Sequence, residues 1–84
     1  MKSKCRKTLE AVFSQPTRSN IKWADIEKLF EAVGALVLEG DGSRVRIIKD
    51  TTKLATHRPH PGKEAKPYQV EAAREFLLAL GVTP

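Results

Sequence analysis

The sequence predicts an α+β fold in which a three-stranded antiparallel sheet carries helices on one face. Apolar residues recur with helical spacing before residue 34, alternate with polar residues between residues 35 and 56, and return to helical spacing after residue 67. The predicted element order is therefore ααβββα, with the second sheet face left to solvent. A chain of 84 residues fills one modest core, so we expect a single domain over residues 1–84.

The first two elements are predicted to be amphipathic helices. In the first, apolar residues recur at helical offsets until Pro16 ends the helix: Cys5, Leu9, Val12 and Phe13. In the second, which follows the loop at 15–20 and ends at Gly34, the helix-spaced residues are Trp23, Ile26, Leu29, Phe30 and Val33. We expect both stripes to enter the core, with Cys5 buried on the first.

The middle of the chain changes to the two-residue period of strands. A short apolar run at 35–38, a glycine-containing turn at 39–43 and the alternating segment RVRII at 44–48 together predict a hairpin. A second turn at 49–52 leads to a third strand through Leu54 and Thr56. Side chains alternate between the two faces of a strand, so Val45, Ile47, Leu54 and Thr56 are expected to face the core.

Prolines mark the end of the third strand and the start of the last helix. Pro59 and Pro61 stop the strand because proline cannot donate a ladder hydrogen bond. The loop RPHPGKEAK at 58–66 leads to Pro67, which suits a first helical position. The final helix is predicted to end at Gly81 and to bury Val70, Ala73, Phe76, Leu77 and Leu80.

The charge distribution favours a polyanionic partner. The chain has 15 Lys and Arg residues against 10 Asp and Glu residues, a net charge of +5. Bases outnumber acids by six to one in residues 1–22 and by seven to two in residues 43–66, whereas residues 23–42 hold five acids and one base. The segment 43–66 also contains both histidines, so it is the candidate site.

The sequence carries the features of a cytoplasmic protein. Its single cysteine, Cys5, excludes an intramolecular disulfide and a Cys-rich zinc site, as is typical of a reducing compartment. The N-terminal segment MKSKCRKTLE lacks the apolar run of a signal peptide, and no apolar run reaches the roughly 18 residues of a membrane span. We expect a cytoplasmic protein without a membrane partner.

The candidate substrate-binding residues are cations on or beside the solvent face of the sheet. By strand alternation, Arg44, Arg46 and His57 are expected to face outward, with Arg58 and Lys63 in the adjoining loop. An arginine fork can bind two phosphate oxygens, which favours RNA or DNA as the ligand. The alternative is a solvated surface that protects the sheet edges, as most charged strand residues do.

Four roles are open to His57 and His60. They could form a metal pair, although two ligands separated by proline make a poor metal motif. They could act as general acid or base, because imidazole has an unperturbed pKa near neutrality and RNA cleavage by the 2′-hydroxyl requires proton transfer. They could bind phosphate or loop atoms, or they could be ordinary surface residues. Tyr68, at the edge of the same loop, could contact a ligand or pack at the helix start.

Several short motifs from Ile21 to Val82 carry a family resemblance. They are IKWADIEKLFEAVGA in the second helix, GDGSRVRI in the turn and strand, PHPGKE in the loop and LGV at the end. Their order and spacing resemble the HicA family of bacterial toxins. The resemblance implies a fold like that of double-stranded-RNA-binding domains, cleavage of mRNA without a metal or other cofactor, and inhibition by a partner antitoxin, HicB. It covers residues 21–84 as a core and leaves residues 1–20 as an N-terminal helical extension.

One position departs from the family pattern. Family members typically have Gly-Ser-His at the start of the second strand, with that histidine catalytic, whereas this chain has Gly42, Ser43 and Arg44. The loop histidine of the PHP motif is retained as His60. In a meander, His57 would lie on the neighbouring strand, where opposing side chains come within about 5 Å. His57 and His60 are therefore the candidate catalytic residues.

The leading hypothesis is a ribonuclease toxin that acts on RNA and is neutralised by a HicB-like antitoxin. The main alternative is a non-catalytic RNA-binding or protein-interaction module of the same fold, in which Arg44 marks lost activity. A third is an interaction protein whose basic face meets an acidic protein.

Overall fold

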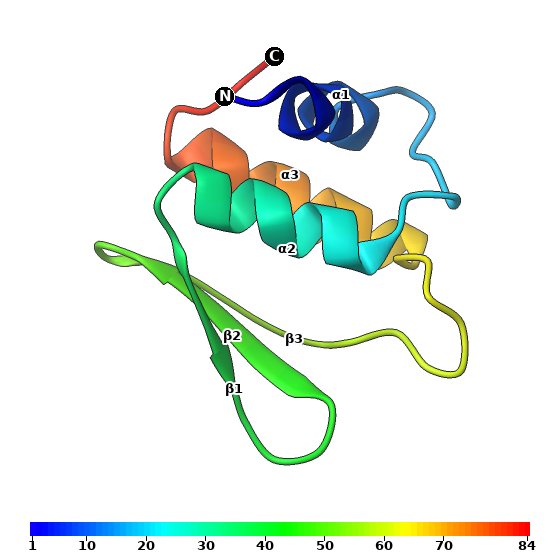
Figure 1. Ribbon diagram of the computed structural model, residues 1–84, viewed down its shortest axis with the longest axis vertical. Helices are drawn as coiled ribbons and strands as arrows, with labels where there is room; N and C mark the ends of the chain where they lie inside the picture. The colour runs from blue at the N-terminus through cyan, green and yellow to red at the C-terminus, as the bar shows by residue number, and fades with distance from the viewer.

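The computed structural model describes residues 1–84 and has the predicted element order ααβββα. The elements are α1 (Ser3–Val12), α2 (Trp23–Ala32), β1 (Leu36–Glu39), β2 (Arg44–Lys49), β3 (Thr52–His57) and α3 (Pro67–Ala79). The helices α2 and α3 cover one face of the sheet, and α1 lies on the far side of these two helices (Figure 1). The predicted α+β fold, with a three-stranded sheet and its helices on one face, is confirmed.

The sheet is an antiparallel meander in which β2 is the central strand. In its register, Val45 of β2 lies opposite Thr56 of β3, and Ile47 lies opposite Leu54. Val45 and Ile47 are buried under the helices, and Leu54 and Thr56 are half-buried at the β3 edge. The predicted alternation is confirmed, because these four residues share the inner face.

The two turns of the meander have different lengths. The β1–β2 turn spans residues 40–43, and Gly42 adopts a positive φ of 62° that glycine tolerates without a Cβ penalty. The β2–β3 turn is shorter than the predicted 49–52, because β2 continues to Lys49 and β3 begins at Thr52. The Lys49 side chain lies on the inner face, where its Nζ donates a hydrogen bond to the Val33 carbonyl oxygen. This contact favours keeping Lys49 in the strand.

The core lies between the sheet and the helices and extends to α1. The rings of Phe30 from α2 and Phe76 from α3 meet edge to face with centroids 5.2 Å apart. From α1, Leu9 and Val12 are buried. Cys5 and Phe13, predicted on the same stripe, are only half-buried and pack against the edge of the core. Fewer residues of the predicted stripe are fully buried than expected, because one side of this short helix faces solvent.

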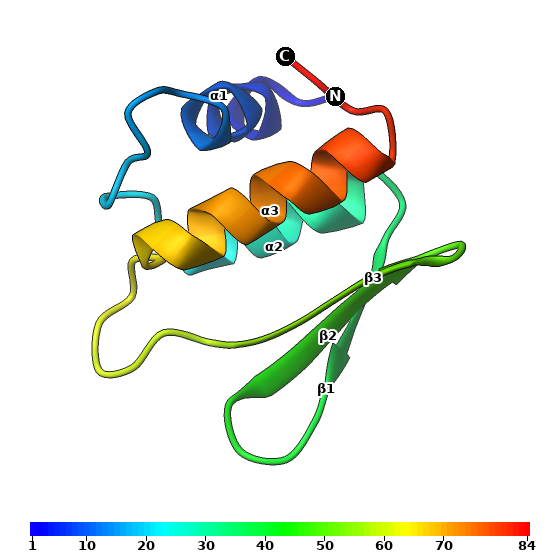
Figure 2. The ribbon, with the colours of Figure 1, turned by 180° about the vertical axis from the view of Figure 1, so that it is seen from behind.

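The loop between β3 and α3 is tied to the start of α2. The Trp23 amide N–H donates to the Lys63 carbonyl oxygen at 3.0 Å, and the Ala65 N–H donates to the Ile21 carbonyl oxygen at 2.7 Å. Figure 2 shows this loop and the α1–α2 linker at the same end of the molecule.

No helix of the structure combines the length and apolarity needed to cross a membrane.

Candidate nucleic-acid interface

Arg44 and His57 lie directly opposite one another at one end of the β2–β3 ladder. Arg44 uses both of its backbone groups toward β1: its N–H donates to the Asp41 carbonyl oxygen at 3.2 Å, and its carbonyl oxygen accepts from the Gly40 N–H at 2.9 Å. The pair with His57 is therefore a non-hydrogen-bonded pair, the type in which opposing side chains lie closest. Both side chains are exposed, as is Arg46 two residues further along β2.

These three residues line one shallow surface pocket. The pocket has a volume of about 450 Å³ and is lined by Gly40, Asp41, Arg44, Val45, Arg46, Ala55, Thr56 and His57. Neither arginine takes part in an ion pair, so both guanidinium groups are free to meet a ligand. Asp41 is the one carboxylate in the lining. The pocket thus combines one imidazole with a cationic surface, which is suited to a phosphate group.

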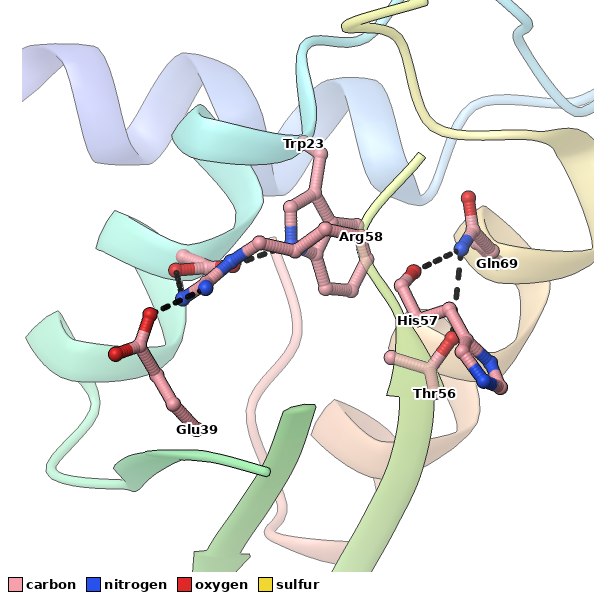
Figure 3. A network of polar contacts seen from close by, with 7 residues as sticks. Trp23, Glu39, Thr56, His57, Arg58 and Gln69 are labelled. Carbon is pink, nitrogen blue, oxygen red and sulfur yellow. Dashed lines mark hydrogen bonds and ion pairs between the residues drawn. The ribbon is translucent and has the colours of Figure 1, made fainter. Parts of the chain in front are cut away.

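Gln69 holds the end of β3 from the α3 side. The Gln69 side chain is buried, and its Nε2 donates to the His57 carbonyl oxygen at 2.6 Å and to the Thr56 Oγ1 at 3.4 Å. Its Oε1 accepts from the Lys66 N–H at 2.9 Å. Figure 3 shows Gln69 reaching the His57 backbone from α3. The backbone that carries the imidazole is therefore fixed to a helix.

Arg58 points away from this pocket. Its guanidinium donates to Glu27 Oε2 at 2.8 Å and to Glu39 Oε1 at 2.5 Å. Figure 3 shows Arg58 reaching toward Glu39, on the opposite side of β3 from the His57 ring. The hydrogen bonds that Arg58 donates to Glu27, and then the one that it donates to Glu39, raise the pKa of Arg58 above its ordinary value. Glu27 also accepts a hydrogen bond from Trp23 Nε1, so Arg58 joins β3 to α2 and β1.

The other predicted site residues lie in the loop at 58–66, outside the pocket. His60 is exposed and precedes Pro61 in a cis peptide bond. Lys63 is exposed and lines a neighbouring hollow with Arg58 and Lys22. Tyr68 is 59% exposed at the start of α3. The structure thus brings Arg44, Arg46 and His57 together and leaves the loop residues outside their pocket.

Sequence reasoning did not identify the residues that hold the pocket in place. Gln69 was not predicted to have a role, and no local signal identified its distant partners. The direction of the Arg58 side chain could have been predicted, because side chains alternate along a strand and the preceding residue, His57, faces outward. No group of three or more His, Cys, Asp or Glu residues able to hold a metal ion is present.

Comparison with known proteins identifies the family. Neither the curated protein sequences nor the solved structures gave a match to this chain. A family model described as the HicA toxin of bacterial toxin–antitoxin systems matches residues 23–78. This segment runs from the first residue of α2 to within one residue of the end of α3 and includes the whole sheet and its pocket. The chain belongs to the HicA toxin family.

Proposed function

We propose that this toxin is a ribonuclease that cleaves mRNA in the cytoplasm without a metal ion, in the pocket lined by Arg44, Arg46 and His57. The observation that carries the proposal is the non-hydrogen-bonded pairing of Arg44 with His57 at the open end of the sheet. At the strand position where the family resemblance leads one to expect histidine, this chain has Arg44. The pairing supplies an imidazole from the adjacent strand.

The proposed reaction is attack of the RNA 2′-oxygen on the neighbouring phosphorus. The 2′-hydroxyl loses its proton, a 2′,3′-cyclic phosphate forms, and the bond from phosphorus to the 5′-oxygen breaks. The leaving 5′-oxygen takes up a proton. His57 carries one of these two proton transfers, since imidazole serves as general base when neutral and as general acid when protonated.

The cations have two proposed roles. Arg44 and Arg46 bind the phosphate and stabilise the charge that develops on the phosphorane, because their guanidinium groups have no competing carboxylate partner. Lys63 binds a phosphate further along the strand, and His60 is the second candidate for proton transfer. Arg58 supports the site, because its guanidinium is already held by Glu27 and Glu39.

The test is RNA decay by purified His57→Ala and His60→Ala proteins in the presence of a chelator. We expect His57→Ala to lower the cleavage rate by about 10²-fold or more, as loss of a general acid or base typically does. His60→Ala is compared with it, because His60 is the second candidate and its exposed imidazole lies outside the pocket. Unchanged cleavage in both variants would remove histidine from the mechanism.

The same assay distinguishes RNA cleavage from the second candidate function, which is binding without catalysis. Arg44 in place of the family histidine favours a non-catalytic module that binds RNA or protein through the same surface. Such a module would bind RNA and leave it intact at every protein concentration. Cleavage that stops on addition of chelator would instead contradict the metal-independent reaction.

We propose that the cognate antitoxin is a HicB-like protein. The support is the family membership, since HicA toxins are paired with an antitoxin. A small reading frame next to the one for this chain, encoding a protein that co-purifies with it and blocks its activity, would agree with this assignment. An adjacent gene for an unrelated protein with the same effect would contradict it.

A further inference from the structure

The helix α1 and the linker after it lie outside the residues matched by the family and form a second basic surface. A hollow of about 400 Å³ separates α1 from the start of α2. On the α1 side it is lined by Lys4, Lys7, Thr8 and Ala11, which recur at helical spacing along one stripe. Its other wall is formed by Arg18, Asn20, Ile21, Lys22 and Asp25. We call this hollow the α1 groove.

The α1 groove has a fixed shape because both of its walls are anchored. Leu9 and Val12 of α1 are buried in the core. Arg74 of α3 donates hydrogen bonds to the Val12 carbonyl oxygen at 3.0 Å and to Thr17 Oγ1 at 3.2 Å. Thr17 in turn donates to Glu71 at 3.2 Å. The linker that presents Arg18 is therefore bound to α3.

The cations of the α1 groove are largely unneutralised. Lys4 pairs with Asp25 at 3.5 Å, which removes one charge of each sign. Lys7, Arg18 and Lys22 are exposed and take part in no ion pair. Three unpaired cations around one groove form a surface suited to successive phosphates of a polyanion.

Lys22 connects this groove to the candidate site. It also lines a hollow that contains Lys63 and Lys66, and a third hollow that contains Arg58 and Pro59. Arg58 follows His57, whose side chain lines the sheet pocket. The three hollows share Lys22, so a basic belt runs from α1 along the loop at 58–66 to Arg58, the residue after His57. Its unpaired cations are Lys7, Arg18, Lys22, Lys63 and Lys66.

We propose that the α1 groove binds the sugar–phosphate backbone of the RNA strand whose scissile phosphate occupies the sheet pocket. This inference rests on the proposed ribonuclease function and adds a second contact region to it. The belt contains one carboxylate without a cation partner, Glu64, and no exposed aromatic residue. The groove therefore contributes affinity for the sugar–phosphate backbone of the RNA and does not discriminate between bases.

The test measures binding of 2′-O-methyl oligoribonucleotides, which lack the attacking hydroxyl and stay intact. A short oligonucleotide fills only the sheet pocket, and a long one also reaches the α1 groove. In the variant Lys7→Gln/Arg18→Gln, we expect affinity for the long oligonucleotide to fall by about tenfold at low salt. The slope of log affinity against log salt should become shallower by about 1.4, since each single-strand phosphate contact contributes about 0.7. Affinity for the short oligonucleotide should stay unchanged.

The matched control is Arg6→Gln/Lys28→Gln, which removes one arginine and one lysine. Both residues are exposed and line none of the three hollows of the belt. Equal effects of the two double variants would overturn the inference, because net charge alone would then explain binding. So would a loss confined to DNA of the same length, which would make the groove a DNA site.

Failure of the inference differs from failure of the proposed function. A parent protein that cleaves RNA, with a Lys7→Gln/Arg18→Gln variant that binds the long oligonucleotide equally well, overturns only the role of the groove. A parent protein that neither binds nor cleaves RNA overturns both. Circular dichroism on each variant checks that the side-chain changes leave the fold intact, and Lys7→Ala/Arg18→Ala provides a second pair of substitutions for the same comparison.

Discussion

The buried amide of Gln69 is the residue on which the end of β3 depends. Because His57 forms a non-hydrogen-bonded pair with Arg44, its carbonyl oxygen points away from β2. Gln69 Nε2 satisfies that oxygen at 2.6 Å, and Gln69 Oε1 satisfies the Lys66 N–H. One side chain thus fixes the backbone of the proposed catalytic residue and the first turn of α3.

Replacing Gln69 should therefore destabilise the protein. We expect Gln69→Leu to lower the free energy of unfolding by about 1–3 kcal/mol, because the partly buried Lys66 N–H and His57 carbonyl oxygen lose their partner. Gln69→Glu should lose at least as much, since the carboxylate still accepts from the Lys66 N–H but places a buried negative charge against the His57 carbonyl oxygen. Urea denaturation measures both changes, with the exposed Gln15→Leu as the control. A Gln69→Leu protein as stable as the parent would contradict this account.

Arg58 allows two ion pairs on one guanidinium to be compared. The side chain of Glu27 is 18% exposed and that of Glu39 is 73% exposed. Double-mutant cycles with Arg58→Met, Glu27→Gln and Glu39→Gln should give a coupling energy of about 1 kcal/mol for Glu27 and only a few tenths for Glu39, because solvent and salt screen the exposed pair. The cycles are measured by denaturation at low and high salt. A larger coupling for Glu39 would mean that exposure does not set the difference.

At the scale of elements, the alternation of apolar and polar residues predicted the strands of the sheet more accurately than it predicted the turns between them. The period of two correctly separated the buried Val45 and Ile47 from the exposed Arg44 and Arg46, because a one-residue slip would expose the whole apolar face. The second turn was predicted too long, since nothing local indicates that Lys49 reaches the Val33 carbonyl oxygen at the end of α2.

The partners of Arg58 and Gln69 show the same limit. Arg58 and Glu27 are separated by 31 residues, and Gln69 and His57 by 12. Only the packed fold brings these pairs together. The sequence therefore predicted the face on which the site lies and three residues of its lining, but it did not predict what holds them.

Arg74 joins α1 to the rest of the fold and can be tested as the anchor of that element. Its guanidinium is half-buried and donates to Val12, Ser14 and Thr17. We expect Arg74→Met to lower the free energy of unfolding by about 1–3 kcal/mol, since these acceptors lose a charged donor. The substitution should also speed hydrogen exchange of the backbone amides of α1 more than that of the amides of β2. The exposed Arg6→Met is the control, and unchanged exchange in α1 would contradict the anchoring role.

Across the whole molecule, the cations divide into those paired with carboxylates and those left unpaired. The acidic residues Glu27 and Glu39 neutralise Arg58, whereas Arg44 and Arg46 of the sheet pocket and five cations of the belt take part in no ion pair: Lys7, Arg18, Lys22, Lys63 and Lys66. The neutralised arginine supports the fold, and the unpaired cations are free for a polyanion. Salt should therefore weaken RNA binding much more than it weakens folding.

Toxicity in a living cell tests whether this arrangement acts as one site. If the proposed ribonuclease function holds, expression of the chain alone should arrest growth, because each cleaved mRNA removes a template for protein synthesis. Arg44→Ala should weaken the arrest, since it leaves His57 without the cation opposite it. Lys53→Ala is the matched control, because Lys53 is an exposed cation on the same sheet face, opposite Ile48 and outside the pocket. Colony counts after induction, at protein levels checked by immunoblotting, measure the effect. Healthy growth with abundant parent protein would favour the non-catalytic module, and equal loss of toxicity in both variants would show that general surface charge, rather than the pocket, is responsible.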